Sequence, residues 1–280
     1  MQTISVIGAG TMGRGIAQAA ILSGYEVFLC DIHTDVLGAA QVSIFDSIDK
    51  GVARGKTAPD AAARAHKSLA LTTSLVDAAT ADLVIEAAPE QAALKQKVFA
   101  TLDSAAPPAT ILATNTSSLS VSVLAGAHSR PDRFIGLHFF NPAHIMPLVE
   151  VIRGDLTSDA TLHTCREFVE RLGKTAVICR DTPAFIVNRV ARPFYGEAFR
   201  LLSENAARVE EIDRLMTSIG FRMGPFELID LIGGDVNFAV TQSVYEAFFQ
   251  DPKYRPHPIQ QRMVASGRLG RKTGRGYYTY

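Results

Sequence analysis

The stretch TISVIGAGTMGRGIAQAAILSGYEVFLCD, residues 3–31, decides the fold of this chain. It opens with a short run rich in β-branched residues, 3–7, which is typical of a buried strand. Closely spaced glycines follow at once, and an apolar helical run continues from them and ends at Gly24. A second apolar strand, 25–30, closes the unit with Asp31. The pattern predicts a strand–turn–helix–strand unit, which is the beginning of a parallel sheet.

The glycines between the first strand and the first helix form a GxGxxG pattern. In this context the first glycine permits a tight turn, the second lets the backbone approach a pyrophosphate, and the third packs helix against strand. The helix N-terminus adds unpaired N–H groups and the positive end of the helix dipole. We therefore predict a dinucleotide site whose turn consists of Gly8, Ala9, Gly10, Thr11, Met12 and Gly13.

Asp31 indicates which dinucleotide is bound. A carboxylate at the end of the second strand can accept hydrogen bonds from both ribose hydroxyls, and it would repel a 2′-phosphate. No arginine follows it, because the next residues are Ile32 and His33. The residue favours NAD over NADP. The alternative is that Asp31 only caps the following helix.

Strands and helices continue to alternate up to residue 182. We expect strands at 83–87, 110–113, 134–137, 148–152 and 175–179, and helices at 90–102 and 159–172. This alternation predicts an α/β fold with a Rossmann-like, doubly wound, mostly parallel sheet. Between the second strand and the next expected strand, apolar residues at helical spacing predict an inserted helical arm over about residues 35–67.

The pattern changes at Asp181-Thr182-Pro183, where a capping residue and a proline predict a helix start. Residues 183–249 have helical spacing, so we expect a sheet domain over residues 1–182 and an all-α domain over residues 183–280. The second domain has more apolar helical surface than one sheet domain covers. We expect it to bind substrate and to form a homodimer.

Composition excludes several classes of protein. The chain has 280 residues, 47% of them hydrophobic, and equal numbers of acidic and basic side chains, which argues against a disordered chain and against a nucleic-acid-binding protein. No apolar run is long enough for a membrane span, and the N-terminus does not resemble a signal peptide. The three cysteines form no CxxC pattern, so no metal site is expected. We expect a soluble cytoplasmic protein.

The segment FIGLHFFNPAHIMPLVEVI, residues 134–152, contains the best candidates for chemistry. Glu150 lies inside an apolar strand, where an unpaired carboxylate would be expensive to bury. His138 ends the neighbouring apolar strand, and its imidazole could compensate that charge while the carboxylate fixes the tautomer of the ring. From the residues alone, a catalytic His–Glu pair and a structural buried ion pair remain equally open.

Seven motifs in order then resemble a known family: GAGTMGRGIAQ, ATNTSSLS, RFIGLHFFNP, PLVEVI, DTPAFIVNR, MGPFELID and GRKTGRGYY. Together they resemble the L-3-hydroxyacyl-CoA dehydrogenase family in its short bacterial 3-hydroxybutyryl-CoA dehydrogenase form, over nearly the whole chain. The resemblance implies an oxidoreductase that transfers a hydride between C3 of a short-chain L-3-hydroxyacyl-CoA and NAD. It also implies that His138 is the catalytic base and that Glu150 is its partner.

The resemblance assigns further residues to the site. Ser117 would lie beside the nicotinamide and the substrate oxygens, and Asn188 would help to hold the substrate. Alone, Ser117 could equally be a strand-end cap, and Asn188 a structural hydrogen-bonding residue. The remaining cofactor contacts that the family implies are Glu90, Lys95, Asn141 and Lys272. From their pattern alone, Glu90 and Lys95 would be solvated charges on a helix.

The helical arm has a role in the same family, which uses such an arm to hold coenzyme A with a serine and a basic residue. Ser47 and Arg54 occupy the matching places, although the family commonly has lysine where this chain has Arg54. An arginine can still bind a phosphate, through a fork of donors. Lys50, on the same side of the helix, is the alternative basic contact.

Two rival functions remain at this point. A β-hydroxyacid or sugar-acid dehydrogenase can share this architecture, but some of those enzymes use a lysine base on the first long helix of the second domain. No lysine occurs between Pro183 and Arg200. A catalytically silent NAD-binding protein would have no need of both His138 and Glu150.

Overall fold

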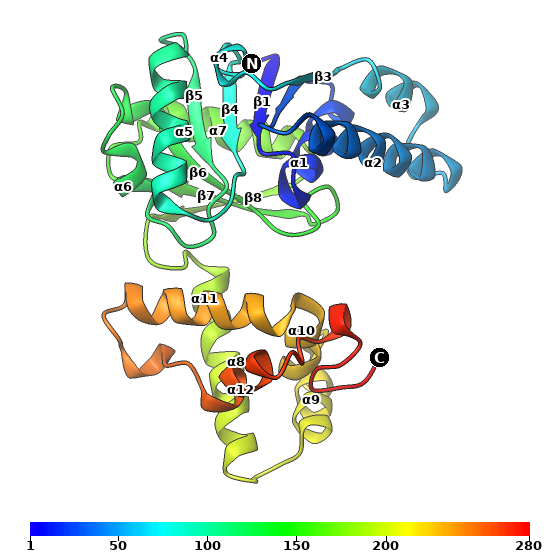
Figure 1. Cartoon of the computed structure of the whole chain (residues 1–280), viewed down its shortest axis with the longest axis vertical. Helices are drawn as coiled ribbons and strands as arrows, with labels where there is room; N and C mark the ends of the chain where they lie inside the picture. The colour runs from blue at the N-terminus through cyan, green and yellow to red at the C-terminus, as the bar shows by residue number, and fades with distance from the viewer. The chain divides into compact units, whose positions relative to one another are not determined.

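The computed structural model describes residues 1–280, which divide into two compact units, Met1–Thr182 and Pro183–Tyr280. Figure 1 shows the first unit in blue to green and the second in yellow-green to red. Each unit has its own secondary structure and its own core. None of the helices combines the length and the apolar character that a bilayer crossing requires.

An eight-stranded sheet forms the centre of the first unit. The strands are ordered β3-β2-β1-β4-β5-β6-β7-β8. Strands are therefore added to one side of β1 as far as β3 and to its other side from β4 onward. Their bounds are β1 (Thr3–Ile7), β2 (Glu26–Cys30), β3 (Leu69–Thr72), β4 (Leu83–Glu86), β5 (Ile111–Thr114), β6 (Phe134–Phe139), β7 (Leu148–Arg153) and β8 (Thr175–Arg180). All neighbouring pairs are parallel except β6 and β7, so the expected doubly wound, mostly parallel sheet is confirmed.

One strand, β3, was not expected from the sequence. It has only four residues, it lies at the edge of the sheet, and its central residues Ala70 and Leu71 are exposed. An edge strand with no buried face carries no apolar alternation, which is the signal that identified the others. The expected strand ends differ by one or two residues from the observed ones, which is the normal scatter of element boundaries.

Helices cover both faces of this sheet (Figure 1). They are α1 (Thr11–Leu22), α2 (Thr34–Ala53), α3 (Pro59–Ala65), α4 (Leu75–Ala78), α5 (Ala92–Ala105), α6 (Val121–Ala125) and α7 (Asp159–Arg171), with a 3₁₀ turn at Pro131–Arg133. The expected helix at 90–102 begins two residues late, because Gln91 has an extended backbone and acts as its N-cap. Glu90 therefore lies in the loop before α5.

Strand alternation separates the two faces. Val6 of β1 and Ile85 of β4 belong to a core shared with α1, α2 and α7. The neighbouring residues point the other way, since Ser5 donates to a carbonyl of α4 and Glu86 bonds to a side chain of α5. The arm formed by α2 and α3 packs through its apolar side on α1, and the residues buried there include Leu37, Ala40, Ile44 and Ile48.

One face of the sheet carries a row of polar side chains. Residues that pair across neighbouring strands share a face, and so do residues two apart along one strand. Glu86 pairs with Thr114, and Thr114 pairs with Gly136. His138 lies two residues beyond Gly136 and directly opposite Glu150. All the polar members of this row therefore project to the face that α5 covers.

The second unit is entirely helical. It contains α8 (Val187–Ser203), α9 (Val209–Ser218), α10 (Pro225–Ile232), α11 (Gly234–Ala247) and α12 (Pro258–Ala265), with 3₁₀ turns at Pro252–Tyr254 and Arg271–Thr273. The helical spacing predicted helices only as far as residue 249, so α12 was not predicted. Two buried aspartates organise this unit: Asp213 accepts two backbone N–H bonds at the start of α10, and Asp230 accepts two from the C-terminal tail.

Candidate active site

The glycine turn between β1 and α1 packs closely against neighbouring backbone on one side and is open on the other. Gly8 has φ +99°, which glycine adopts readily, and a Cβ there would lie 2.8 Å from the Ala87 carbonyl oxygen. A Cβ on Gly13 would lie 1.7 Å from the Gly8 carbonyl oxygen, so the helix can pack on the strand only at glycine. At Gly10 a Cβ would meet nothing within 4 Å. That side of the turn is open, as binding of a pyrophosphate requires.

Asp31 is tied to this turn by its carboxylate. One oxygen accepts the N–H of Ala9 at 2.9 Å, and the other accepts the N–H of His33, the residue before α2, at 3.1 Å. Each oxygen retains acceptor capacity, because an ionised carboxylate offers about four lone-pair sites. The carboxylate is therefore held in place at the end of β2, beside the open turn, in the position for ribose recognition.

His138 and Glu150 meet across the antiparallel pair β6 and β7. Their backbones are in register, and His138 Nδ1 lies 2.7 Å from Glu150 Oε2. The two side chains are only 8% and 1% exposed, so the contact is made away from bulk water. The imidazole also packs against the ring of Phe140, with centroids 4.5 Å apart. The contact of Nδ1 with Glu150 fixes the orientation of the imidazole ring, so that Nε2 lies on the side away from Glu150.

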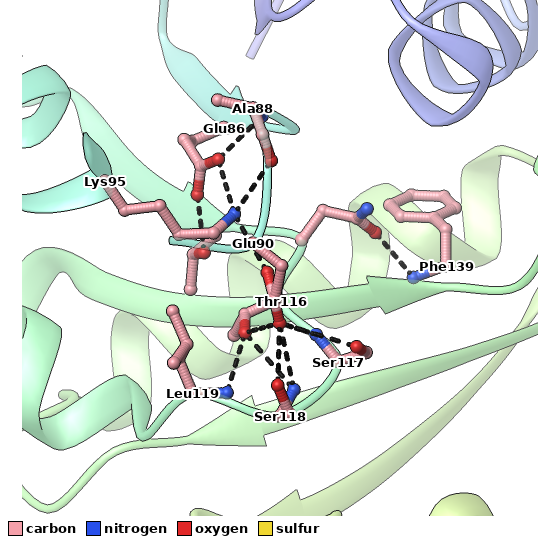
Figure 2. Close-up of polar contacts among 11 residues, drawn as sticks. Glu86, Ala88, Glu90, Lys95, Thr116, Ser117, Ser118, Leu119 and Phe139 are labelled. Atoms are coloured by element: carbon pink, nitrogen blue, oxygen red, sulfur yellow. Dashed lines mark hydrogen bonds and ion pairs between the residues drawn. The ribbon is translucent and has the colours of Figure 1, made fainter. Parts of the chain in front are cut away.

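The TNTSS loop after β5 is fastened to the end of β6. The side-chain oxygen of Asn115 accepts the N–H of Phe139 at 2.9 Å, one residue beyond His138 (Figure 2). Sequence reasoning missed Asn115, because an asparagine in a polar loop carries no distinguishing pattern. The contact places the loop that contains Ser117 next to the strand that contains the histidine.

A buried lysine lies behind this loop. Lys95 on α5 is 1% exposed, and its Nζ donates to Glu86 Oε1 at 2.6 Å and lies 3.2 Å from Glu90 Oε2 (Figure 2). Glu86 is fully buried at the end of β4, and it also accepts bonds from the Thr114 hydroxyl and the Ala88 N–H. The pattern-based reading of Lys95 as a solvated helix charge was wrong.

Glu90 connects the lysine to the TNTSS loop. Its Oε1 accepts the Thr116 hydroxyl at 2.5 Å, the Ser117 N–H at 2.8 Å and the Ser118 N–H at 3.1 Å (Figure 2). Its pattern-based placement on the helix was wrong, since it lies in the loop before α5, and its carboxylate is held by these donors although the residue as a whole is exposed. Two adjacent N–H groups and one ammonium therefore hold a single carboxylate.

The two carboxyls of this network titrate differently. Burial raises the pKa of Glu86 above its usual value, although the charge of Lys95 and the hydrogen bond from Thr114 oppose the effect. Burial also acts to raise the pKa of Glu90, but the Lys95 charge and the bonds from Thr116 and Ser117 outweigh it. The pKa of Glu90 therefore lies below its usual value, and this carboxyl is ionised at neutral pH.

The arm and the loop after β6 contain further predicted residues. In the arm, Ser47 accepts a hydrogen bond from Gln18 of α1 at 3.0 Å, and Arg54 is exposed just after the end of α2. Lys50 pairs with Asp46 at 2.6 Å on the surface of α2. Asn141 is exposed in the loop after β6.

Two predicted residues belong to the helical unit. Asn188 lies half-buried in the first turn of α8, and its backbone carbonyl accepts a bond from Arg192. Lys272, in the 3₁₀ turn near the C-terminus, donates to the Asp235 carboxylate at 2.7 Å. Within this unit, Lys272 therefore fastens the tail to the start of α11.

Comparison with known proteins decides the family. Residues 3–182 match the model of the 3-hydroxyacyl-CoA dehydrogenase NAD binding domain, and residues 185–280 match that of the C-terminal domain. The chain belongs to the 3-hydroxyacyl-CoA dehydrogenase family. Members of this family are NAD-dependent oxidoreductases, and NAD is the cofactor that its first domain binds. The open glycine turn and the anchored Asp31 fit this cofactor.

Individual relatives cover the chain throughout. It is 47% identical over its whole length to a 3-hydroxyadipyl-CoA dehydrogenase of Escherichia coli, of which it spans 59%, and 43% identical to a 3-hydroxybutyryl-CoA dehydrogenase of Bradyrhizobium diazoefficiens, of which it spans 96%. The crystal structure of a Ralstonia eutropha (S)-3-hydroxybutyryl-CoA dehydrogenase superimposes with a TM-score of 0.96 at 42% identity, with 100% of this chain and 99% of that one covered.

The lysine network yields a stability prediction. Lys95→Met keeps the length of the side chain but leaves Glu86 buried without its cation, so we expect a loss of about 3–5 kcal/mol in the free energy of unfolding. Lys97→Met, on the exposed side of the same helix, is the matched control and should stay within about 0.5 kcal/mol. Urea unfolding of both variants measures the difference. Equal stability of the two variants would contradict the importance of the buried pair.

Proposed function

We propose that this chain oxidises the C3 hydroxyl of a short-chain L-3-hydroxyacyl-CoA to the 3-oxoacyl-CoA, reversibly and with NAD. The observation that carries the proposal is the buried contact of 2.7 Å between His138 and Glu150. The contact orients the ring, and a carboxylate beside an imidazole stabilises its protonated form. A histidine held in this way is suited to exchange a proton with a substrate hydroxyl.

The proton transfer follows from the geometry of the ring. Nδ1 is held by Glu150, so we assign proton exchange to Nε2. In the oxidation, Nε2 takes the proton of the C3 hydroxyl while the C3 oxygen becomes a carbonyl, and Glu150 stabilises the imidazolium that forms. In the reduction, the same imidazolium returns the proton to the C3 oxygen. NAD, when bound, supplies the acceptor for the hydride that leaves C3.

Other residues bind and orient rather than move protons. We assign Ser117 and Asn188 to the oxygens of the substrate, where they contribute positioning. Asp31 recognises the adenosine ribose, and its negative charge selects against a 2′-phosphate. The glycine turn holds the pyrophosphate at the N-terminus of α1. The other proposed cofactor contacts are Glu90, Lys95, Asn141 and Lys272; for Lys95, the structure supports an indirect role through Glu90.

The catalytic pair is tested by removing the base. His138→Gln should leave NADH binding nearly intact and lower kcat by about 10²–10⁴-fold, because the hydroxyl proton loses its acceptor. Glu150→Gln should also lower kcat, since the imidazolium loses its charged partner. Steady-state kinetics with acetoacetyl-CoA and NADH measure both effects. His163→Gln, on the exposed surface of α7, is the control and should behave as wild type.

Folding of these variants is checked by circular dichroism, because removing one partner of a buried pair can destabilise a protein by itself. A folded His138→Gln enzyme with the kcat of wild type would refute the proposed mechanism. The dinucleotide fold would stand in that case, and the pair would be a structural one.

We propose that the arm formed by α2 and α3 binds the coenzyme A part of the substrate. Its exposed Arg54 offers a fork of donors to a phosphate, and Ser47 lies two turns earlier on the same helix. Lys50 is less suited to this role, because its ammonium already pairs with Asp46. An arm of this kind favours a CoA ester over the free acid that a β-hydroxyacid dehydrogenase would take.

The arm is tested by truncating Ser47 and Arg54 to alanine together. We expect a higher KM for the CoA ester with a smaller effect on kcat, because the contacts are remote from the reacting carbon. The control is Arg64→Ala, which removes an exposed positive charge from α3 of the same arm. An unchanged KM for the ester in the double variant would refute this role of the arm.

We propose further that the helical unit forms a homodimer. Its surface exposes ten large apolar side chains, and a partner that covers such residues would remove them from water. Seven of them, on or beside α8 to α11, are Val190, Leu215, Ile219, Phe221, Leu231, Ile232 and Val236, each between 42% and 69% exposed in the single chain. A second copy of the chain is the occupant we propose, because most homo-oligomers bury such patches by two-fold symmetry.

Sedimentation equilibrium tests the dimer directly. At micromolar protein we expect a mass about twice the 30.2 kDa of one chain. Leu215→Glu with Ile219→Glu should return the mass to that of one chain, because burying two carboxylates in an apolar interface is costly. An active wild-type enzyme that sediments as a single chain would refute the proposal.

A further inference from the structure

The helical unit contains a buried cation with no anion beside it. Arg192 on α8 is 5% exposed, and its guanidinium donates to the backbone carbonyls of Asn188 and Asn237 and to the hydroxyl of Thr241. All three acceptors are neutral, and no carboxylate lies within 4.0 Å of it. The nearest aromatic ring, that of Tyr195, is 4.9 Å from the guanidinium carbon.

This arrangement is expensive for the protein alone. Buried charges in proteins are normally paired, because desolvation of an unpaired charge is not repaid by neutral acceptors. Burial lowers the pKa of Arg192 to about 10, which still leaves the side chain positively charged at neutral pH. The helical unit therefore maintains a positive charge in its interior that its own residues do not neutralise.

Unused hydrogen-bond donors accompany the charge. Nη2 of Arg192 has no acceptor, since its three bonds come from Nε and Nη1. Asn237, whose carbonyl Arg192 contacts, is 1% exposed, and its side-chain Nδ2 has no partner either. The side-chain oxygen of Asn237 is already taken by Gln260, which fixes the orientation of the amide. The group that would satisfy such donors is an acceptor-only anion, and a carboxylate is the common one.

The position of the cation relates it to the substrate. Arg192 follows Asn188 by four residues, so the two lie on the same side of α8, and Arg192 Nε donates to the Asn188 carbonyl at 3.2 Å. One helical turn rises about 5.4 Å. In a six-carbon acyl chain, three carbon–carbon bonds of about 1.5 Å separate C3 from the terminal carbon. These bonds span about 4 Å in an extended chain, and a hydrogen bond of about 3 Å at each end carries the reach beyond one helical turn. An acyl chain whose C3 oxygen is near Asn188 can therefore bring its far end to Arg192.

We propose that Arg192, with the amide of Asn237, binds a carboxylate at the far end of the acyl chain, so that the preferred substrates are 3-hydroxyacyl-CoA esters of dicarboxylic acids. This inference rests on the proposed function and on the placement of Asn188 at the substrate. A neutral acyl chain would leave the guanidinium buried and unpaired. A site built around a charged donor discriminates strongly against an analogue that lacks the matching group.

A matched pair of substrates tests the proposal on the wild-type enzyme. The thioesters 3-hydroxyadipyl-CoA and 3-hydroxyhexanoyl-CoA have the same chain length and differ only in a terminal carboxylate or methyl group. We expect kcat/KM with NAD to be about 10–100-fold higher for the adipyl ester, as for a hydrogen bond to a charged group. Equal values, or a preference for the hexanoyl ester, would overturn the proposal.

Two variants attribute the preference to Arg192. Arg192→Gln should lower kcat/KM for the adipyl ester by about 10–100-fold and leave that for the hexanoyl ester within a few-fold. Asn237→Asp places a carboxylate on the residue that Arg192 already contacts, so it should abolish the preference while the protein stays folded. Arg200→Gln, on the exposed surface of the same helix, should keep the preference. A folded Asn237→Asp enzyme that retains the preference would overturn the assignment.

Failure of this inference and failure of the proposed function give different results. If no CoA ester is oxidised, including the four-carbon one, the proposed function fails. If the four-carbon and hexanoyl esters are oxidised and the adipyl ester has no advantage, the dehydrogenase activity stands and only the role of Arg192 is refuted.

Discussion

The candidate site depends on one buried ammonium group. Lys95 is the only cation that contacts the carboxylates of both Glu86 and Glu90, and it does so from the interior of α5. Through Glu86 it is joined to the ends of β4 and β5, and through Glu90 to the loop that contains Ser117. Without that charge, two carboxylates would face each other beside the dinucleotide turn. The lysine thus allows a carboxylate-lined site to exist at the edge of an apolar sheet.

The same face of the sheet supplies the acid–base pair. Because side chains alternate along a strand, a register that buries Val149 and Val151 in the main core necessarily turns Glu150 to the opposite face. The antiparallel pairing of β6 and β7 then sets it against His138. A shift of one residue would place the glutamate among the apolar side chains and separate the pair. The packing of the core therefore fixes the geometry on which the proposed chemistry depends.

Features that depend on local sequence patterns could be predicted from the sequence, and features that depend on tertiary contacts could not. The glycine turn, the strands with apolar runs and the doubly wound sheet follow from local patterns, as does the suspicion that an acid inside LVEVI needs a partner. Glu86 carries the same signal inside LVIE, but no histidine in a neighbouring strand of the sequence indicates a partner for it. Lys95 could not be found in this way, since a lysine at a helical position that is followed by a glutamine and a second lysine has the pattern of a solvated side chain. Its burial depends on the tertiary position of Glu86.

Two of the three buried cations of this chain, Lys95 and Arg192, differ in what surrounds them, and the difference has a physical meaning. Lys95 has two carboxylates within 3.2 Å, so its charge is neutralised by the fold itself. Arg192 is buried nearly as deeply and has only carbonyl and hydroxyl oxygens for partners. The pairing of Lys95 with Glu86 and Glu90 shows that this fold can place carboxylates beside a buried cation. The missing negative charge is thus best supplied from outside the chain, by a ligand that arrives with its own carboxylate.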